Sequence, residues 1–89
     1  MNLEEALQTI VNLEADVAGK KRILRVQWFV VGDAIKAARE AKKLPLRQLG
    51  AMLALPGHPP VSAAFLSYIE NARRYPSPEM RKRILEVLS

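Results

Sequence analysis

The stretch FLSYIENARRYPSPE, residues 65–79, decides the fold of this chain. Phe65, Leu66 and Ile69 are the side chains expected on the buried face of an amphipathic helix. A turn follows, and then Ser77-Pro78 predicts the start of another helix. A serine hydroxyl can accept an orphan amide hydrogen there, and proline is tolerated in a first helical turn. The stretch therefore predicts two helices joined by a short turn.

On the N-terminal side of this stretch lies the segment LPGHPPVS, residues 55–62. Its three prolines and one glycine cannot continue a helix, because proline lacks an amide donor and clashes with the preceding turn. Ser62 is a good N-cap for the helix AAFLSYIENA. Before the segment, LRQLGAMLAL predicts a short helix. The inward-facing side chains expected on it are Leu49, Met52 and Leu53.

The segment KKRILRVQWFVV, residues 20–31, fits two secondary structures. The alternation of Leu24, Val26 and Trp28 with polar residues is typical of a strand. A helical spacing of three and four residues is shown by Leu24, Trp28, Val31, Ile35 and Ala38. We expect a helix through GDAIKAAREAKK that begins within this segment and ends before Pro45.

Two further amphipathic segments complete the expectation of an all-α fold with about five helices. The C-terminal segment EMRKRILEVL, residues 79–88, is expected to bury Met80, Ile84 and Leu88 and to expose Arg81, Lys82 and Arg83. Residues 3–18 predict an N-terminal helix. Its apolar stripe consists of Leu3, Leu7, Ile10, Leu13 and Val17.

Within the N-terminal stripe, Leu3, Ile10 and Val17 recur at seven-residue intervals, as expected of a helix that pairs with another helix. We interpret the stripe as a dimerisation or partner-binding surface; the alternative is that it packs on its own domain. This interpretation divides the chain into an N-terminal helical arm, residues 1–30, and a second domain, residues 31–89.

Charge is placed unevenly along the chain. Residues 1–18 carry four acidic and no basic side chains, whereas residues 19–89 carry all 14 Lys and Arg against five acidic side chains. A strongly basic body predicts a polyanionic partner, although a solvated basic surface would have the same composition. There is no cysteine, and neither a secretory signal nor a membrane-spanning run is expected. We therefore expect a cytoplasmic, nucleoid-associated protein that does not contact the membrane.

Chemistry-bearing residues are few. His58 is the only histidine and lies in the proline-rich turn, without cysteine or paired acids within reach in the sequence. There is no glycine-rich phosphate loop and no metal-ligand spacing. We expect no enzyme activity, no catalytic residue, no metal and no cofactor.

Residues 31–88 resemble the helix-turn-helix domain of the Cro/cI-type (Xre) repressor family. The resemblance is carried by IKAAREAKKLPLRQLGAML and the stretch quoted first. The matching residues are Arg39-Glu40, Leu44, Leu49-Gly50, Leu66-Ser67-Tyr68-Ile69-Glu70-Asn71, Arg74 and Pro76-Ser77-Pro78. The resemblance implies a lambda-repressor-like helix-turn-helix bundle, here with an extra N-terminal amphipathic helix.

The chain departs from the family pattern at two places. The turn between the second and third family helices is enlarged by Pro56 to Val61, where the family has a short Gly-Val-Ser. The glycine that normally follows Glu-Asn is Ala72. Because glycine ends that helix in the left-handed conformation, alanine either strains the turn or extends the helix.

The resemblance implies a DNA interface around the helix AAFLSYIENA, which enters the major groove in this family. The base-reading residues it implies are Ala63, Ala64, Ser67 and Tyr68, and the phosphate contacts are Arg47, Asn71, Arg73, Arg74 and Lys43. The base-reading set is thin, and the two alanines are equally explained as good helix formers. A partly buried ion pair between Arg39 and Glu70, orienting the reading helix, is also implied.

We therefore expect a sequence-specific regulator of transcription that binds double-stranded DNA as a homodimer, acting as a repressor. One alternative is an antitoxin that regulates its own promoter while its acidic arm covers a basic toxin. Another is a protein-interaction adaptor that keeps the helix-turn-helix fold without reading DNA. The adaptor remains an alternative because the base-reading set is weak, and the antitoxin remains one because the arm is acidic.

Overall fold

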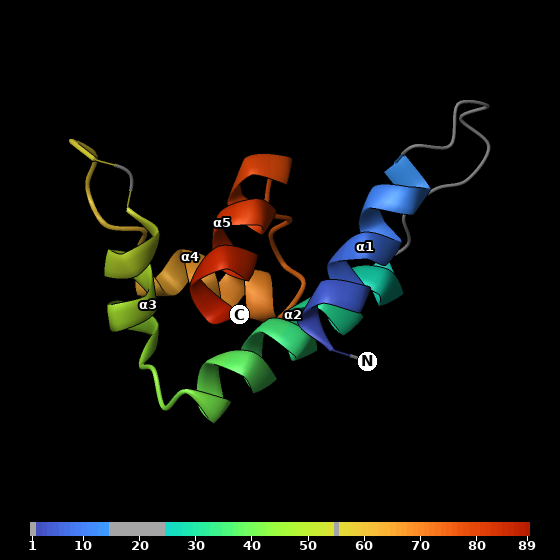
Figure 1. The fold of residues 1–89 in the computed structure, drawn as a ribbon, viewed down its shortest axis with the longest axis horizontal. Helices are drawn as coiled ribbons and strands as arrows, with labels where there is room; N and C mark the ends of the chain where they lie inside the picture. Colours follow the sequence, from blue (N-terminus) through green and yellow to red (C-terminus); the bar gives the residue numbers. More distant parts are fainter. Residues whose placement is uncertain (1, 15–24, 55) are drawn as a thin grey trace.

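A computed structural model of the chain describes residues 2–14, 25–54 and 56–89. These residues form helices and connecting turns, and no strand occurs in the described ranges (Figure 1). The helices are α1 (Leu3–Glu14), α2 (Arg25–Ala41), α3 (Leu46–Leu53), α4 (Ala63–Glu70) and α5 (Pro78–Leu88). The expected all-α fold with about five helices is confirmed for the described residues.

Local signals in the sequence account for where α4 and α5 begin. The Ser62 hydroxyl accepts a hydrogen bond from the Phe65 amide at 3.0 Å, and the Ser77 hydroxyl accepts one from the Met80 amide at 3.2 Å. Pro78 occupies the first turn of α5. The segment that fitted both strand and helix is helical from Arg25 onward. Residues 15–24 lie outside the described residues.

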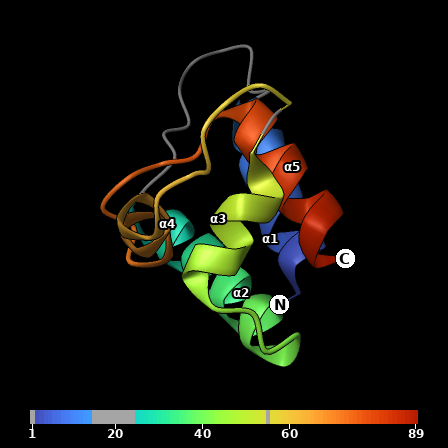
Figure 2. The same cartoon turned by 90° about the vertical axis from the view of Figure 1, so that its left-hand side faces the viewer.

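The helices surround one core, with α4 on one side of the molecule and α5 on the other (Figure 2). α1 packs along α2 and also contacts α5. The largest fully buried side chains are Ile10, Ile35, Leu49, Leu66, Ile69, Ile84 and Val31. Met52 was expected on the inner face of α3 but is exposed, because Leu49 and Leu53 already fill that face.

The N-terminal stripe belongs to this core. Leu3, Leu7 and Ile10 are buried in the single chain, Leu13 is partly buried, and Val17 lies outside the described residues. Burying such a side chain stabilises the fold by about 1.5–3 kcal/mol, so α1 is part of the folded unit. The predicted dimerisation surface does not fit this burial, because these side chains are already covered. The predicted domain boundary after residue 30 falls inside α2.

Arg81 was expected to be exposed and is buried instead. Its guanidinium donates to the Pro76 carbonyl at 2.9 Å and lies 5.7 Å from the centre of the Trp28 ring. Trp28 in turn stacks on Tyr75, with ring centres 4.9 Å apart. Arg81 is three residues before the buried Ile84, so it shares the inner face of α5. The planar cation is accommodated because a carbonyl and an aromatic face replace water.

The backbones of α2 and α4 come close together where the two helices cross at Gly32. A Cβ atom at Gly32 would collide with the carbonyl oxygen of Glu70 and would also press on that of Ile69. The two backbones therefore touch, and no side chain can be inserted between them. Gly32 fixes how deeply α4 sits against the rest of the protein.

A residue with left-handed backbone lies two positions after the last residue of both α2 and α4. Lys43 has φ 55° and Ala72 has φ 57°. In each case the next amide reaches back five residues: Leu44 N–H donates to Arg39 O at 3.1 Å, and Arg73 N–H to Tyr68 O at 2.8 Å. This is the Schellman pattern, which normally uses glycine. Ala72 therefore ends α4 with local strain, of about 1–2 kcal/mol, and does not extend it.

Replacing Gly32 by alanine should lower the free energy of unfolding by about 3 kcal/mol, because two helix backbones must separate to admit the new methyl group.

Replacing Lys43 by glycine should raise the free energy of unfolding by about 1 kcal/mol, because the side chain is exposed and only the backbone strain is relieved. Urea unfolding followed by circular dichroism measures both. Equal stability of the Gly32→Ala variant and the original chain would contradict the close crossing.

Candidate nucleic-acid interface

The outward face of α4 carries the residues that the resemblance implies as base-reading residues. Ala63, Ala64 and Tyr68 are exposed and Ser67 is partly buried, whereas Leu66 and Ile69 point into the core. α4 thus has a buried side that anchors it and a free side with small and hydroxyl-bearing residues. Phe65, expected to face inward, is partly buried.

The predicted ion pair between α2 and α4 is confirmed. Arg39 Nε lies 2.7 Å from Glu70 Oε2, and Arg39 Nη2 lies 3.2 Å from Glu70 Oε1, so the ion pair is bidentate. A third donor, Arg39 Nη1, reaches the Leu44 carbonyl at 2.9 Å. One guanidinium thereby joins the end of α2, the following turn and the end of α4. The hydrogen bond to Glu70 raises the pKa of Arg39, and the desolvation of its side chain partly opposes this.

This pair also determines the charge on the outward face of α4. Glu70 is the only acidic residue of α4, and its side chain is just 6% exposed. Its negative charge is compensated at close range by Arg39. α4 therefore presents no exposed carboxylate to a partner, although its sequence contains one.

A polar hollow lies between the C-terminal half of α4 and the N-terminal end of α2. It is lined by Arg25, Phe29, Ser67, Tyr68, Asn71 and Arg73. The Arg25 guanidinium lies 5.3 Å from the centre of the Phe29 ring. Two basic side chains and several hydroxyl or amide groups meet here without a carboxylate. Such a lining suits a phosphate group.

The sequence pattern did not identify Phe29 as part of a candidate site. The available signal was helical register, since Arg25 and Phe29 are four residues apart and so share a face of α2. That register could not be used while the segment also fitted a strand.

The predicted phosphate contacts fall into two groups. Asn71, Arg73 and Arg74 are exposed at the exit of α4, where Asn71 and Arg73 line the hollow. The Asn71 amide nitrogen donates to the Ser67 carbonyl at 2.8 Å, so one of its hydrogens caps the helix.

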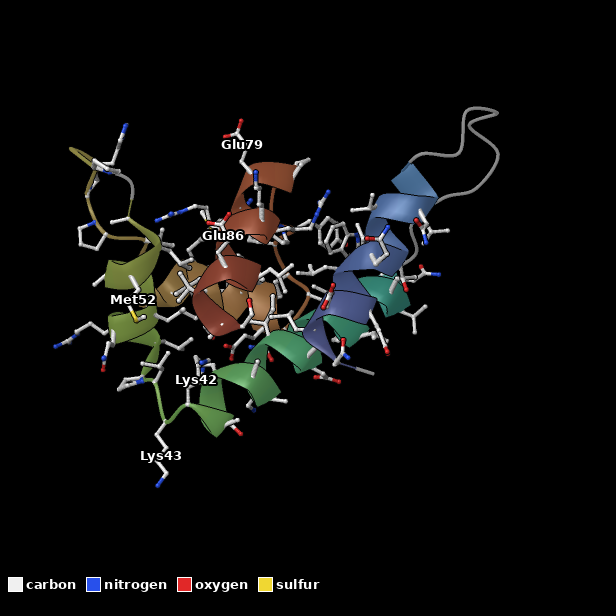
Figure 3. The ribbon with its side chains drawn as sticks, in the orientation of Figure 1. Lys42, Lys43, Met52, Glu79 and Glu86 are labelled. Atoms are coloured by element: carbon white, nitrogen blue, oxygen red, sulfur yellow. The ribbon has the colours of Figure 1, made fainter. Side chains whose placement is uncertain are left out.

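Lys43 and Arg47 form the second group. They are exposed in and just after the turn between α2 and α3, and neither lines the hollow. Figure 3 shows Lys43 pointing away from the body of the protein.

The enlarged turn connects α3 to α4 and extends past the end of α3 (Figure 1). Its residues 56–60 are exposed, including His58, and Leu55 lies outside the described residues. The part of the turn that leads into α4 is held by a hydrogen bond from Val61 N–H to the Gly50 carbonyl at 3.1 Å. A Cβ at Gly50 would collide with the Val61 carbonyl, so glycine is required for this close approach.

Arg83 supports the other end of the turn. It was expected to be exposed but is partly buried, and its Nη2 lies 3.4 Å from the carbonyl oxygens of both Met52 and Ala54. These carbonyls are at the C-terminal end of α3, where a cation is favourable. α5 thus holds the place where the turn leaves α3.

Two acidic side chains of the C-terminal half of the chain, Glu79 and Glu86, belong to α5 and not to α4. Glu79 and Glu86 project from α5 in Figure 3, and α5 lies on the opposite side from α4 in Figure 2. The side that carries α4 thereby avoids these carboxylates. A polyanion approaching α4 would meet arginines rather than the acidic residues of α5.

Within the described ranges, no three His, Cys, Asp or Glu side chains are grouped so as to hold a metal ion. None of the described helices has the length and apolar character needed to cross a membrane. Comparison with protein-family models, curated proteins and solved structures finds no match for this chain.

Replacing Arg39 by alanine should lower the free energy of unfolding by about 3–5 kcal/mol, because Glu70 would be left buried and unpaired. The double variant Arg39→Met/Glu70→Leu should lose less than either Arg39→Met or Glu70→Leu alone, since it removes both charges together. Thermal or urea unfolding of the four chains measures this coupling. Losses that simply add would contradict a buried pair.

Proposed function

We propose that this protein is a sequence-specific regulator of transcription that binds double-stranded DNA as a homodimer, most simply as a repressor in the cytoplasm. α4 is the reading helix of the proposal, and Ala63, Ala64, Ser67 and Tyr68 face the bases. Asn71, Arg73 and Arg74 contact phosphates beside the groove, joined by Arg47 and Lys43 near the start of α3.

The observation that carries this proposal is that α4 is held in a fixed position and has basic side chains beside its exposed side. Gly32 and the Arg39–Glu70 pair hold α4 against α2, while the free side of α4 exposes small and polar side chains. Basic residues border that side, and the only acidic residue of α4 is paired internally. A major groove admits a helix of this kind, and its phosphate rims attract the flanking arginines.

The thin base-reading set favours one other candidate, a protein-interaction adaptor. None of the four reading residues is an Arg, Asn or Gln, the side chains that make two-pronged contacts to bases. DNA shape would have to supply part of the specificity of a regulator with this surface. An adaptor would bind a protein through the same face and would show no salt-dependent affinity for duplex DNA.

Binding of duplex DNA should weaken steeply with salt, because arginines and lysines displace condensed counterions from the phosphates. With roughly four to six phosphate contacts per protomer, a dimer should show a log–log slope of affinity against salt of about −7 to −11. Fluorescence anisotropy with a labelled mixed-sequence duplex at several salt concentrations measures the slope. A flat response would rule out the DNA-binding proposal and favour the adaptor.

Alanine variants should separate phosphate contacts from base contacts. Arg73→Ala and Arg74→Ala should weaken binding to all sequences about equally, whereas Ser67→Ala and Tyr68→Ala should change the preference between sites. In vitro selection of bound duplexes, followed by affinity measurements on preferred and random sites, distinguishes the two. The same pattern from both groups of variants would show that α4 is not the reader.

A further inference from the structure

The N-terminal half of α2 carries an apolar patch on its outward side. The patch consists of Val26, Phe29 and Val30, which are 60%, 42% and 39% exposed. Their spacing of three and four residues makes the patch continuous along one face of the helix. None of the three belongs to the buried core.

We propose that this patch is where two copies of the chain associate, with α2 of one copy antiparallel to α2 of the other about a two-fold axis at Phe29. The inference deepens the proposed function, because a homodimeric regulator needs such a surface. The stripe of α1 cannot provide it, since Leu3, Leu7 and Ile10 are covered within the single chain.

Charge on α2 selects a second copy and its direction. Arg25 and Asp33 are both exposed, and each is four residues from Phe29, on opposite sides of it along the chain. An antiparallel pair centred on Phe29 therefore places Arg25 of each copy opposite Asp33 of the other. Within the described part of the chain, Asp33 has no ion-pair partner. A parallel pair would instead bring the two Arg25 side chains together.

The same arrangement orients the reading helices. Phe29 borders the hollow shared with α4, whereas Val30 borders a depression shared with Ala6 and Thr9 of α1, so α4 and α1 flank the patch on opposite sides. The two-fold axis of an antiparallel helix pair is perpendicular to the plane of the pair, so it keeps an element on its side of that plane. Both copies of α4 consequently face the same side of the dimer, as one duplex requires.

Three half-exposed apolar side chains per copy make a small interface, so we expect weak association, with a dissociation constant of about 10–100 μM. Sedimentation equilibrium of the full chain without DNA, over a concentration range that spans this value, measures it. A chain that stays monomeric throughout would overturn the proposal.

Val26→Glu should raise the dimer dissociation constant at least about tenfold, because a carboxylate would be buried without a partner. Val11→Glu is the matched control: Val11 is also exposed, at 47%, but lies on α1 outside the patch, and the variant should dimerise normally. All of these positions are exposed, so circular dichroism should show folded variants. Equal weakening by both substitutions, or by neither, would overturn the proposal.

Charge reversal tests the direction of pairing. Arg25→Asp and Asp33→Arg should each weaken the dimer, and the double variant Arg25→Asp/Asp33→Arg should restore it by reversing both pairs. Failure of the double variant to recover would overturn the antiparallel arrangement. DNA binding by the original chain is measured separately. A monomer that binds DNA would contradict this inference and the homodimer of the proposed function but leave its DNA contact standing, whereas a dimer that ignores DNA would contradict the DNA contact and leave this inference standing.

Discussion

The contact between α2 and α4 is the constraint on which the rest of the structure depends. Gly32 lets the two backbones touch, and Arg39 then closes its two-pronged contact with Glu70 while holding the Leu44 carbonyl. These interactions fix the position of α4 and the path of the turn that leads into α3. α4 buries only a few side chains, so these interactions are needed to hold its outward face in one position. Losing one partner would cost packing and leave an uncompensated charge at the same place.

The distribution of charge follows from this arrangement. Compensation of Glu70 leaves the free side of α4 without an exposed carboxylate, and the remaining acidic residues of the C-terminal half belong to α5. Arg81 and Arg83 do not add to the basic surface in a simple way, because they serve the fold by contacting backbone carbonyls. The net charge of the chain therefore overstates the charge available to a partner. What matters for the proposed DNA contact is the smaller group of arginines around α4.

For α1 and for the N-terminal half of α2, the tertiary structure changes the interpretation of the apolar pattern. The stripe of α1 has the repeat of a pairing helix, but α2 and α5 cover it within the same chain. The N-terminal half of α2, in contrast, was ambiguous in sequence and carries the exposed apolar patch. A seven-residue repeat records only that a helix has an apolar side. Whether that side meets its own chain or another copy depends on which elements compete for it.

The sequence by itself determined the all-α character of the described residues and the serine caps of α4 and α5, and a family resemblance in it led to the pairing of Arg39 with Glu70. Serine caps, proline starts and apolar spacing act over a few residues, whereas the pair was expected only because the sequence resembles a known family. The tertiary structure alone decided the burial of Arg81, the exposure of Met52 and the need for glycine at position 32. These depend on what the folded chain brings against each residue. Periodicity shows that a helix has an inner side, but it cannot show which neighbour will fill it or how close two backbones will come.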